Sequence, residues 1–335
     1  MWEPGLTVGM GVPLSILDLA PVRADADPRS AFTASVELAR LAEGAGYRRV
    51  WYAEHHNMPT IASSATSVLI AHVAAHTERI RLGAGGIMLP NHSPLVIAEQ
   101  FGTLATLHPG RIDLGLGRAP GSDRATMYAL RRDATGADRF PEDVLELQAF
   151  LGDDSRVPGV HAYPGRGTNV PLYVLGSSLY GAQLAAALGL PYAFASHFAP
   201  AALHEAVALY RREFRPSEKQ PEPHVIAGMN VLAADTEEAA QRQFQQALRT
   251  RVRAFARADV RLSDEQADAV LDSPEGRPIR DMLRYTAAGR PAEVRDALES
   301  FAKQADADEL IITLPAPATE DRLRSAELVA AELLA

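Results

Sequence analysis

Two adjacent histidines follow an apolar, strand-like segment early in the chain. In WYAEHHN (51–57), His55 and His56 come directly after Glu54, at the end of the aromatic and apolar run. An imidazole exchanges protons near neutral pH, so one of these histidines is a candidate general base or hydrogen-bond donor. Zinc is the rival interpretation, but neighbouring residues on a strand point to opposite sides, and the sequence has no H-E-x-x-H motif. We therefore predict acid–base or hydrogen-bonding chemistry here, and no metal.

An arginine stands where another strand-like segment meets a glycine-rich turn. In RIDLGLGRAPGSD (111–123), Arg118 lies between Gly117 and Gly121, and a helix is expected to start near Ser122. The amides of a helix N-terminus and a forked guanidinium both favour phosphate, so this turn is a candidate anion site. A surface arginine on a tight turn is the alternative that this segment alone leaves open.

Glycines interrupt the strand-like segment LGAGGIM (82–88) at Gly83, Gly85 and Gly86. Glycine weakens a strand interior, and it often marks a bulge or a place where a ligand or another backbone comes close. The pattern therefore indicates either a bulge or a planar ring lying against this strand.

A third turn combines glycine with two serines. Gly176, Ser177 and Ser178 lead from the strand-like YVLG into a helix-like segment. Serine commonly caps helices, but hydroxyls and free amides at such a turn also form part of an anion cradle. Together with Arg118, this turn predicts one phosphate site. A flat ligand with a phosphate tail, beside a histidine, fits flavin mononucleotide (FMN), and no G-x-G-x-x-G string has the spacing of a dinucleotide site.

Strand-like and helix-like segments alternate along the chain. Eight strands, each followed by a helix, predict a parallel (β/α)₈ TIM barrel, with an open doubly wound sheet as the alternative. In a barrel the carboxyl ends of the strands build the active site, which would bring these turns together. We predict a single domain over 1–335, with a helical, strand-free insertion at about 236–305. The expected strands are 6–10 with 15–19, 47–54, 80–88, 112–117, 171–176, 191–196, 224–234 and 307–315, and the expected helices are 29–45, 64–77 (N-cap Ser63 or Ser64), 93–108, 122–152, 178–189, 199–215 and 319–335.

Composition narrows the function classes. The 335 residues carry a net charge of −9, so no basic surface is available for nucleic acid or an anionic membrane. The absence of cysteine excludes disulfides, iron–sulfur clusters and a thiol nucleophile. Lysine occurs only at Lys219 and Lys303, outside apolar segments, which disfavours Schiff-base chemistry. The N-terminus does not resemble a signal peptide, and glycine, serine and proline break the uncharged stretch 167–204, so a cytoplasmic protein is expected.

Three segments resemble one known family over nearly the whole chain. AEHHNMPTIASSAT, LGAGGIMLPNHSPLVIAEQFGTLATLHPGRIDLGLGRAPGSD and LGSSLYGAQLAAALGLPYAFASHFAP are similar to the bacterial luciferase-like, flavin-dependent monooxygenases, and more narrowly to their alkanal-monooxygenase-like subgroup. The resemblance implies a TIM barrel that takes reduced FMN from a separate NAD(P)H:flavin reductase. It further implies reaction with O₂ through a C4a-hydroperoxyflavin, which oxygenates a small apolar or carbonyl substrate such as an aldehyde.

The resemblance also implies roles for residues. His55 matches the catalytic histidine, and Gly85–Gly86 match the pair whose non-prolyl cis peptide lies against the flavin ring. Arg118 matches the phosphate-binding arginine, and Ser177 and Tyr180 match further phosphate contacts. The complete set predicted to bind the cofactor is Glu54, Gly85, Gly86, Met88, Gly117, Arg118, Gly176, Ser177, Ser178 and Tyr180.

The expected substrate pocket includes Leu14, Met58 and His197. Two positions depart from the luciferase pattern: Gly117 stands where a cysteine is common, and Gly176 stands where an acid is common. Both departures lie at the predicted flavin, so light emission is not expected.

Other functions remain open from the sequence. An oxidoreductase using the deazaflavin F420 has the same barrel, but its longer anionic tail needs a more basic mouth. A flavin-binding protein without turnover and a metal-dependent hydrolase are further alternatives. Family members often dimerise through the helices matching 64–77 and 93–108, so the resemblance implies a homodimer.

Overall fold

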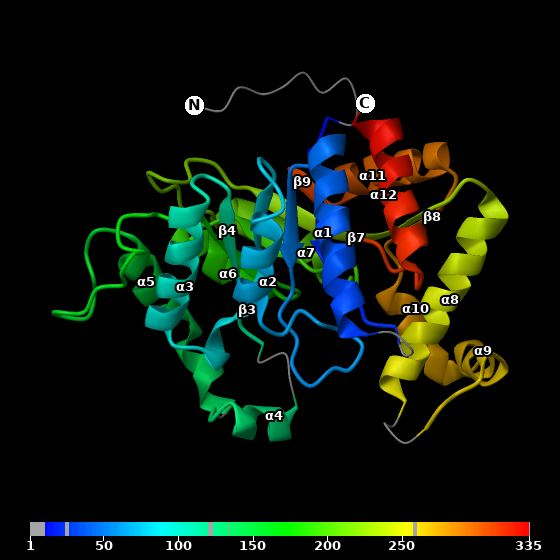
Figure 1. Cartoon of the computed structure of the whole chain (residues 1–335), viewed down its shortest axis with the longest axis horizontal. Helices are drawn as coiled ribbons and strands as arrows, with labels where there is room; N and C mark the ends of the chain where they lie inside the picture. The colour runs from blue at the N-terminus through cyan, green and yellow to red at the C-terminus, as the bar shows by residue number, and fades with distance from the viewer. Residues whose placement is uncertain (1–10, 24–26, 120–122, 133, 257–259, 335) are drawn as a thin grey trace.

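The computed structural model describes residues 11–23, 27–119, 123–132, 134–256 and 260–334 (Figure 1). Gly121, Ser122 and the expected strand at 6–10 lie outside these ranges. Within them, no helix combines the length and the apolar character that crossing a membrane requires.

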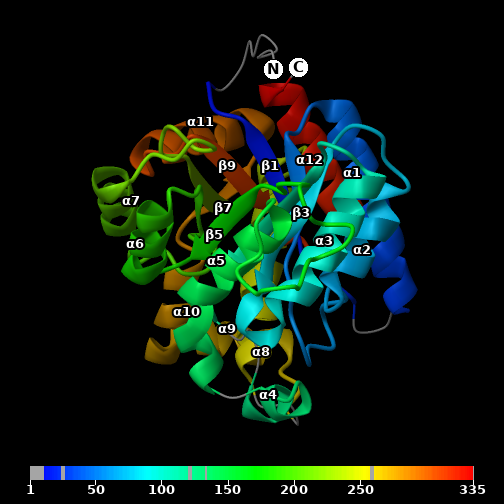
Figure 2. The same cartoon turned by 90° about the vertical axis from the view of Figure 1, so that its left-hand side faces the viewer.

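Eight parallel strands close into a barrel (Figure 2). Each of the first six strands pairs with the next, β7 pairs with β9, and β9 pairs with β1. The closure of this ring confirms the predicted TIM barrel and excludes the open sheet. The barrel strands are β1 (Leu14–Asp18), β2 (Arg49–Tyr52), β3 (Arg81–Met88), β4 (Ile112–Gly117), β5 (Leu172–Gly176), β6 (Tyr192–Phe194), β7 (Val225–Ala233) and β9 (Glu309–Thr313).

A ninth strand, β8 (Thr286–Gly289), pairs with the second half of β7, outside the ring. The prediction that 236–305 contains no strand is therefore wrong. The segment TAAG has two alanines, a glycine and a single β-branched residue, so it shows neither β propensity nor alternation. Its pairing with the long β7 determines its conformation, and a local sequence pattern does not reveal such pairing.

Helices cover the outside of the barrel (Figures 1 and 2). The first begins at a capping Asp27 with proline at its first position, and it ends at a left-handed Gly46. The helices of this layer are α1 (Pro28–Ala45), α2 (Thr66–Ala74), α3 (Pro94–Leu107), α5 (Phe140–Leu151), α6 (Leu179–Leu188), α7 (Leu203–Glu213), α11 (Pro291–Gln304) and α12 (Thr319–Leu333). The short α4 (Arg124–Ala129) has no buried residue and lies apart from this layer, at the lower end in Figures 1 and 2.

Two helix details differ from the expectations. The stretch expected to be helical over 122–152 contains α4, a 3₁₀ helix η2 (Ala134–Arg139) and α5, and Arg131 between them adopts a left-handed conformation with φ 56°. The N-cap of α2 is Ala65, without a side-chain cap. Ser63 instead donates a hydrogen bond to the carbonyl of Ala53. This bond ties the loop back to the end of β2.

The insertion before β9 forms its own small helical layer. It comprises α8 (Glu237–Phe255), α9 (Asp264–Asp272), the 3₁₀ helix η3 (Pro274–Gly276) and α10 (Arg277–Met282), drawn in yellow to orange in Figure 1. These helices bury a separate apolar cluster that includes Leu248, Val252, Ala267, Leu271, Ile279 and Leu283.

A buried ion network fills the amino end of the barrel. The guanidinium of Arg49, which is 1% exposed, lies 2.7 Å from Asp113 and 2.9 Å from Glu309. It also donates to the hydroxyl of Tyr173 at 2.7 Å, and the indole of Trp51 donates to Asp113 at 3.2 Å. Because these side chains close one end, a ligand site must be sought at the other.

Candidate active site

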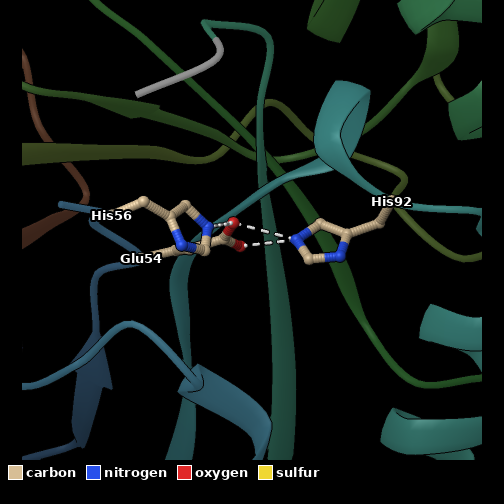
Figure 3. A group of neighbouring side chains, drawn as sticks. All are labelled: Glu54, His56 and His92. Atoms are coloured by element: carbon tan, nitrogen blue, oxygen red, sulfur yellow. Dashed lines mark hydrogen bonds and ion pairs between the residues drawn. The ribbon is translucent and has the colours of Figure 1, made fainter. Parts of the chain in front are cut away.

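The carboxyl ends of β2 and β3 are held together by Glu54 and two histidines (Figure 3). The carboxylate of Glu54 lies 2.6 Å from Nε2 of His56 and 2.9 Å from Nε2 of His92, and it accepts from the amide of Met88 at 3.1 Å. Burial acts to raise the pKa of Glu54, but these hydrogen bonds outweigh it, and the pKa is lowered. The side chain is therefore ionised, and its oxygens are engaged within the protein.

Glu54, His56 and His92 also satisfy the spacing of a metal site, since their ligand atoms lie within 4.8 Å of one another. A cation would have to replace the hydrogen bonds that both imidazoles make with the carboxylate. The sequence interpretation missed His92, which stands 38 residues from Glu54. Only the pairing of β2 with β3 brings the two together.

His55 is not part of this group, as the alternation of neighbouring side chains predicts. It is half-buried, and its Nδ1 is inaccessible to solvent and has no hydrogen-bond partner. Burial lowers its pKa and outweighs the backbone of Ala53 and the charge of Glu54, which act to raise it, while the charges of His56 and Arg251 lower it further. The imidazole is therefore neutral near pH 7, the form in which a histidine can accept a proton.

His197, which follows β6, has a similar environment. Its Nδ1 is also inaccessible and without a partner, and burial lowers its pKa to about 3, with further lowering by Arg251 and His55. Asn230 on β7 holds its backbone, donating to the His197 carbonyl at 2.7 Å. Gly228 makes room for the ring, because a Cβ there would lie 2.4 Å from Nδ1. The structure thus brings His197 within electrostatic reach of His55.

The peptide between Gly85 and Gly86 is cis, as the family resemblance implies. The pairing of β3 with β4 shifts register between Ala84 and Ile87, so the bulge interpretation is correct. A Cβ on Gly85 would lie 2.8 Å from Leu17, and one on Gly86 would lie 2.7 Å from the Gly115 carbonyl. Close packing inside the protein therefore already requires glycine at both positions. That a flavin ring lies against this strand stays a prediction.

Arg118 and Tyr180 come together although they follow different strands. The guanidinium carbon of Arg118 lies 4.0 Å from the centre of the Tyr180 ring, and its Nε donates to the carbonyl of Ala137 at 3.2 Å. Its one ion pair in the described chain, with Asp138, is long at 3.9 Å, and the side chain is 40% exposed. The guanidinium is thus oriented by stacking, and within the described residues most of its donors are left for a ligand.

The N-terminus of α6 lies next to this pair, because Tyr180 is its second residue. Ser178 occupies the N-cap position in an extended conformation, yet its side chain makes no capping hydrogen bond. Ser177 is half-buried in the same turn, and Gly176 ends β5. Ordinary helix capping therefore does not explain why a serine stands at position 178. Its hydroxyl and the first amides of α6 can bind an anion instead.

The predicted pocket residues do not all meet. Met58 is 47% exposed in the loop after β2, and Met88 packs its sulfur toward Gly117, where a Cβ would lie 2.9 Å away. Leu14 is the first residue of β1, at the opposite end of the barrel, and it is buried in the apolar layer between strands and helices. The structure therefore does not place Leu14 at the mouth. Leu14 is an apolar residue at a strand end, and such residues are common in the core as well as in pockets, so the sequence pattern does not separate the two.

Comparisons with known proteins agree with this arrangement. A family model described as luciferase-like monooxygenase matches residues 12–308. A luciferase-like monooxygenase of Escherichia coli (strain K12) is 49% identical, over 95% of this chain and 96% of that protein. The N-acetyl-S-alkylcysteine monooxygenase of Bacillus subtilis (strain 168) is 33% identical, over 96% of this chain and 98% of that protein. The crystal structure of apo-MsnO8 matches with a TM-score of 0.85 and 38% identity, over 96% and 97% of the two chains. The chain therefore belongs to the luciferase-like, flavin-dependent monooxygenase family.

Proposed function

We propose that this protein is a monooxygenase that uses reduced FMN and O₂. The observation that supports it most is the stacked Arg118–Tyr180 pair beside the uncapped N-terminus of α6, at the same end of the barrel as His55. Bound reduced flavin would supply the electrons that activate O₂. One oxygen atom would enter the substrate, and the other would leave as water as the flavin becomes oxidised.

The phosphate of FMN fits the described residues. Arg118 would bind it through its free donors, and Ser177, Ser178 and the first amides of α6 would complete the cradle. Tyr180 would keep the guanidinium in place by stacking. The flavin ring would then extend toward the Gly85–Gly86 peptide.

His55 would act at the reacting end. Its imidazole is neutral near pH 7, so it can accept a proton or stabilise a developing negative charge through its N–H. Glu54 would act indirectly, because its carboxylate is bound to His56 and His92 and fixes the loop that carries His55.

A second candidate, an F420-dependent oxidoreductase, has one specific observation in its favour. A cavity of about 350 Å³ beside η2 is lined by Arg131, Arg132 and Arg139, near the chain segment that contacts Arg118. Such a cavity offers positive charge to an anionic tail longer than that of FMN. Asp143 and Glu146 also line it and offset much of this charge, so FMN remains the preferred cofactor.

The proposal includes one partner protein and a class of substrate. A separate NAD(P)H:flavin reductase would supply the reduced flavin. The substrate would be a small apolar or carbonyl compound such as an aldehyde. The relative that acts on N-acetyl-S-alkylcysteine adds a thioether to the groups worth screening.

We also propose a homodimer formed through α2 and α3. Val68 on α2 is 68% exposed, and Val96 and Leu107, both on α3, are 43% and 65% exposed. Burying such side chains in an interface is favourable. Sedimentation velocity of the protein and of Val68→Glu tests this proposal, which predicts a dimer that the charge dissociates.

Rapid mixing of O₂ with the protein and photoreduced FMN tests the monooxygenase proposal. If the proposal is right, oxidised flavin absorbance returns more slowly than in free FMN, and an added aldehyde is converted with the same stoichiometry as flavin oxidation. A return as fast as that of free flavin, with no product, would overturn it. Binding and reduction of F420 would then be measured.

A further inference from the structure

Arg251 on α8 differs from its neighbours on the same helix. Arg249 is paired with Asp264 at 2.7 Å and with Asp268 at 2.5 Å, and Arg253 is paired with Asp264 at 2.5 Å. Arg251 is half-buried, yet within the described chain its guanidinium has neither a hydrogen bond nor an ion pair. An arginine keeps its charge under these conditions, so a cation stands partly out of water without a counterion.

The carboxyl-terminal part of α8 lies at the mouth of the barrel. Both views place it on the same, lower side as α4 and the loop after β2, which contains His55 (Figures 1 and 2). In addition to burial, the charge of Arg251 lowers the pKa of both His55 and His197. The position of α8 in both views and these charge effects agree that Arg251 faces the end of the barrel that carries the two histidines.

Two of these three side chains have a buried polar atom without a hydrogen-bond partner. The Nδ1 atoms of His55 and His197 are inaccessible to solvent and have no hydrogen-bond partner. Buried polar atoms without partners are uncommon in folded proteins and call for an explanation. Two such atoms and a guanidinium without a protein partner in the described chain, all at the same end of the barrel, favour a polar ligand there.

The charge of that ligand follows from the acids nearby. The carboxylate of Glu54, from the same loop as His55, is turned toward His56 and His92 and is occupied there. In the proposed function, the phosphate of FMN binds Arg118 and the start of α6. Because no carboxylate of the described residues pairs with Arg251, another molecule is the candidate source of a negative charge.

We propose that Arg251 binds a carboxylate of the substrate and positions it beside His55 and His197. A planar guanidinium matches a carboxylate in geometry and pairs with it through two parallel hydrogen bonds. This inference rests on the proposed function, and it narrows the substrate class to small acids that carry an apolar part. Arg251 is a specificity-determining residue in this assignment.

Isothermal titration calorimetry of the protein loaded with oxidised FMN tests the assignment. Hexanoate, hexanamide and hexanal are the probes, and the variants are Arg251→Gln and Arg251→Lys. The control is Arg242→Gln, which removes an exposed arginine from the same helix. Hexanoate should bind roughly 10- to 100-fold more tightly than hexanamide, the effect of a hydrogen bond to a charged group. Arg251→Gln should abolish this preference, Arg251→Lys should keep part of it, and Arg242→Gln should keep all of it.

Two results would overturn the assignment. One is equal binding of hexanoate and hexanamide to the unaltered protein. The other is an Arg251→Gln variant that loses FMN affinity along with hexanoate affinity, which would assign Arg251 to the flavin. The proposed function is tested separately, because rapid mixing with O₂ measures flavin oxidation and needs no acid. Failure of oxygen chemistry with the hexanoate preference intact would reject the monooxygenase while leaving the carboxylate site.

Discussion

At the amino end of the barrel, the buried guanidinium of Arg49 meets two carboxylates and a tyrosine hydroxyl. At the carboxyl end, the half-buried guanidinium of Arg251 meets no partner within the described chain. Both ends take a positive charge out of water, but among the described residues only the guanidinium at the amino end is paired with carboxylates. Since taking a charge out of water without a partner is costly, the difference separates a region that stabilises the fold from one that we propose ligands complete.

The same contrast holds for neutral groups. The indole of Trp51 and the hydroxyl of Ser15 both reach carboxylates at the amino end. The imidazoles of His55 and His197 leave Nδ1 unpaired at the carboxyl end. Substitutions at the two ends should therefore affect different measurements, stability at one end and turnover or binding at the other.

The largest effect is expected from His55→Ala. Losing a general base or a positioned donor should lower the rate of substrate oxygenation by about 10²- to 10⁴-fold. FMN affinity and the free energy of unfolding should change little, because Nδ1 of His55 makes no hydrogen bond in the protein. Single-turnover kinetics measures the rate, and fluorescence titration measures the affinity. The exposed His76→Ala is the control, and a His55→Ala variant with normal turnover would remove His55 from the mechanism.

Glu309→Gln should instead affect stability. Burial acts to raise the pKa of Glu309, but Arg49, with His224 and Arg48, holds it at about 2, below its ordinary 4.5. Removing this charge leaves Arg49 undercompensated, so the free energy of unfolding should fall by about 3–5 kcal/mol in urea titrations at neutral pH. The exposed pair of Glu327 with Arg324 offers the control, and Glu327→Gln should cost below about 1 kcal/mol.

The lowered pKa also fixes the sign of the acid response. The contribution of Glu309 is fully present above pH 4.5 and is lost as the pH falls toward 2, because the unfolded chain then binds the additional proton. Glu309→Gln should therefore show a weaker fall in stability over that interval. A variant with the same acid response as the unaltered protein would contradict the role assigned to the amino end.

Arg118→Ala tests the binding side of the comparison. FMN should bind more weakly by about 1.5–3 kcal/mol, the value of a hydrogen bond to a charged group. Riboflavin, which lacks the phosphate, should be unaffected. Arg156→Ala removes an exposed arginine in the loop after α5 and serves as the control. Equal weakening of both flavins would show that Arg118 does not bind the phosphate.

The two ends also differ in how well the sequence predicts them. The eight barrel strands follow from buried apolar runs bounded by turns, and His55, Gly85–Gly86 and Arg118 lie at strand ends that a parallel barrel must bring to one face. These features are local, so a single sequence contains them.

The amino-end network was not predicted, because Arg49, Asp113 and Glu309 come from three strands far apart in the sequence. His92 and Arg251 were missed for the same reason: nothing near them in the sequence indicates which side chains they will face. The error at Leu14 has a related cause, since burial on one side of a strand or the other is decided by packing.

The smallest effect is expected from two serines at helix N-termini. Ser263 caps α9 with a reciprocal capping box, whereas Ser178 at the start of α6 makes no capping hydrogen bond. Ser263→Ala should therefore cost about 0.5–2 kcal/mol of stability and leave FMN binding unchanged. Ser178→Ala should leave stability unchanged and weaken FMN binding by about 0.5–1.5 kcal/mol, because its hydroxyl is free for the phosphate. Urea unfolding and fluorescence titration of both variants measure the two effects. If Ser178→Ala destabilises the protein as Ser263→Ala does and binds FMN normally, the turn after β5 is an ordinary helix start.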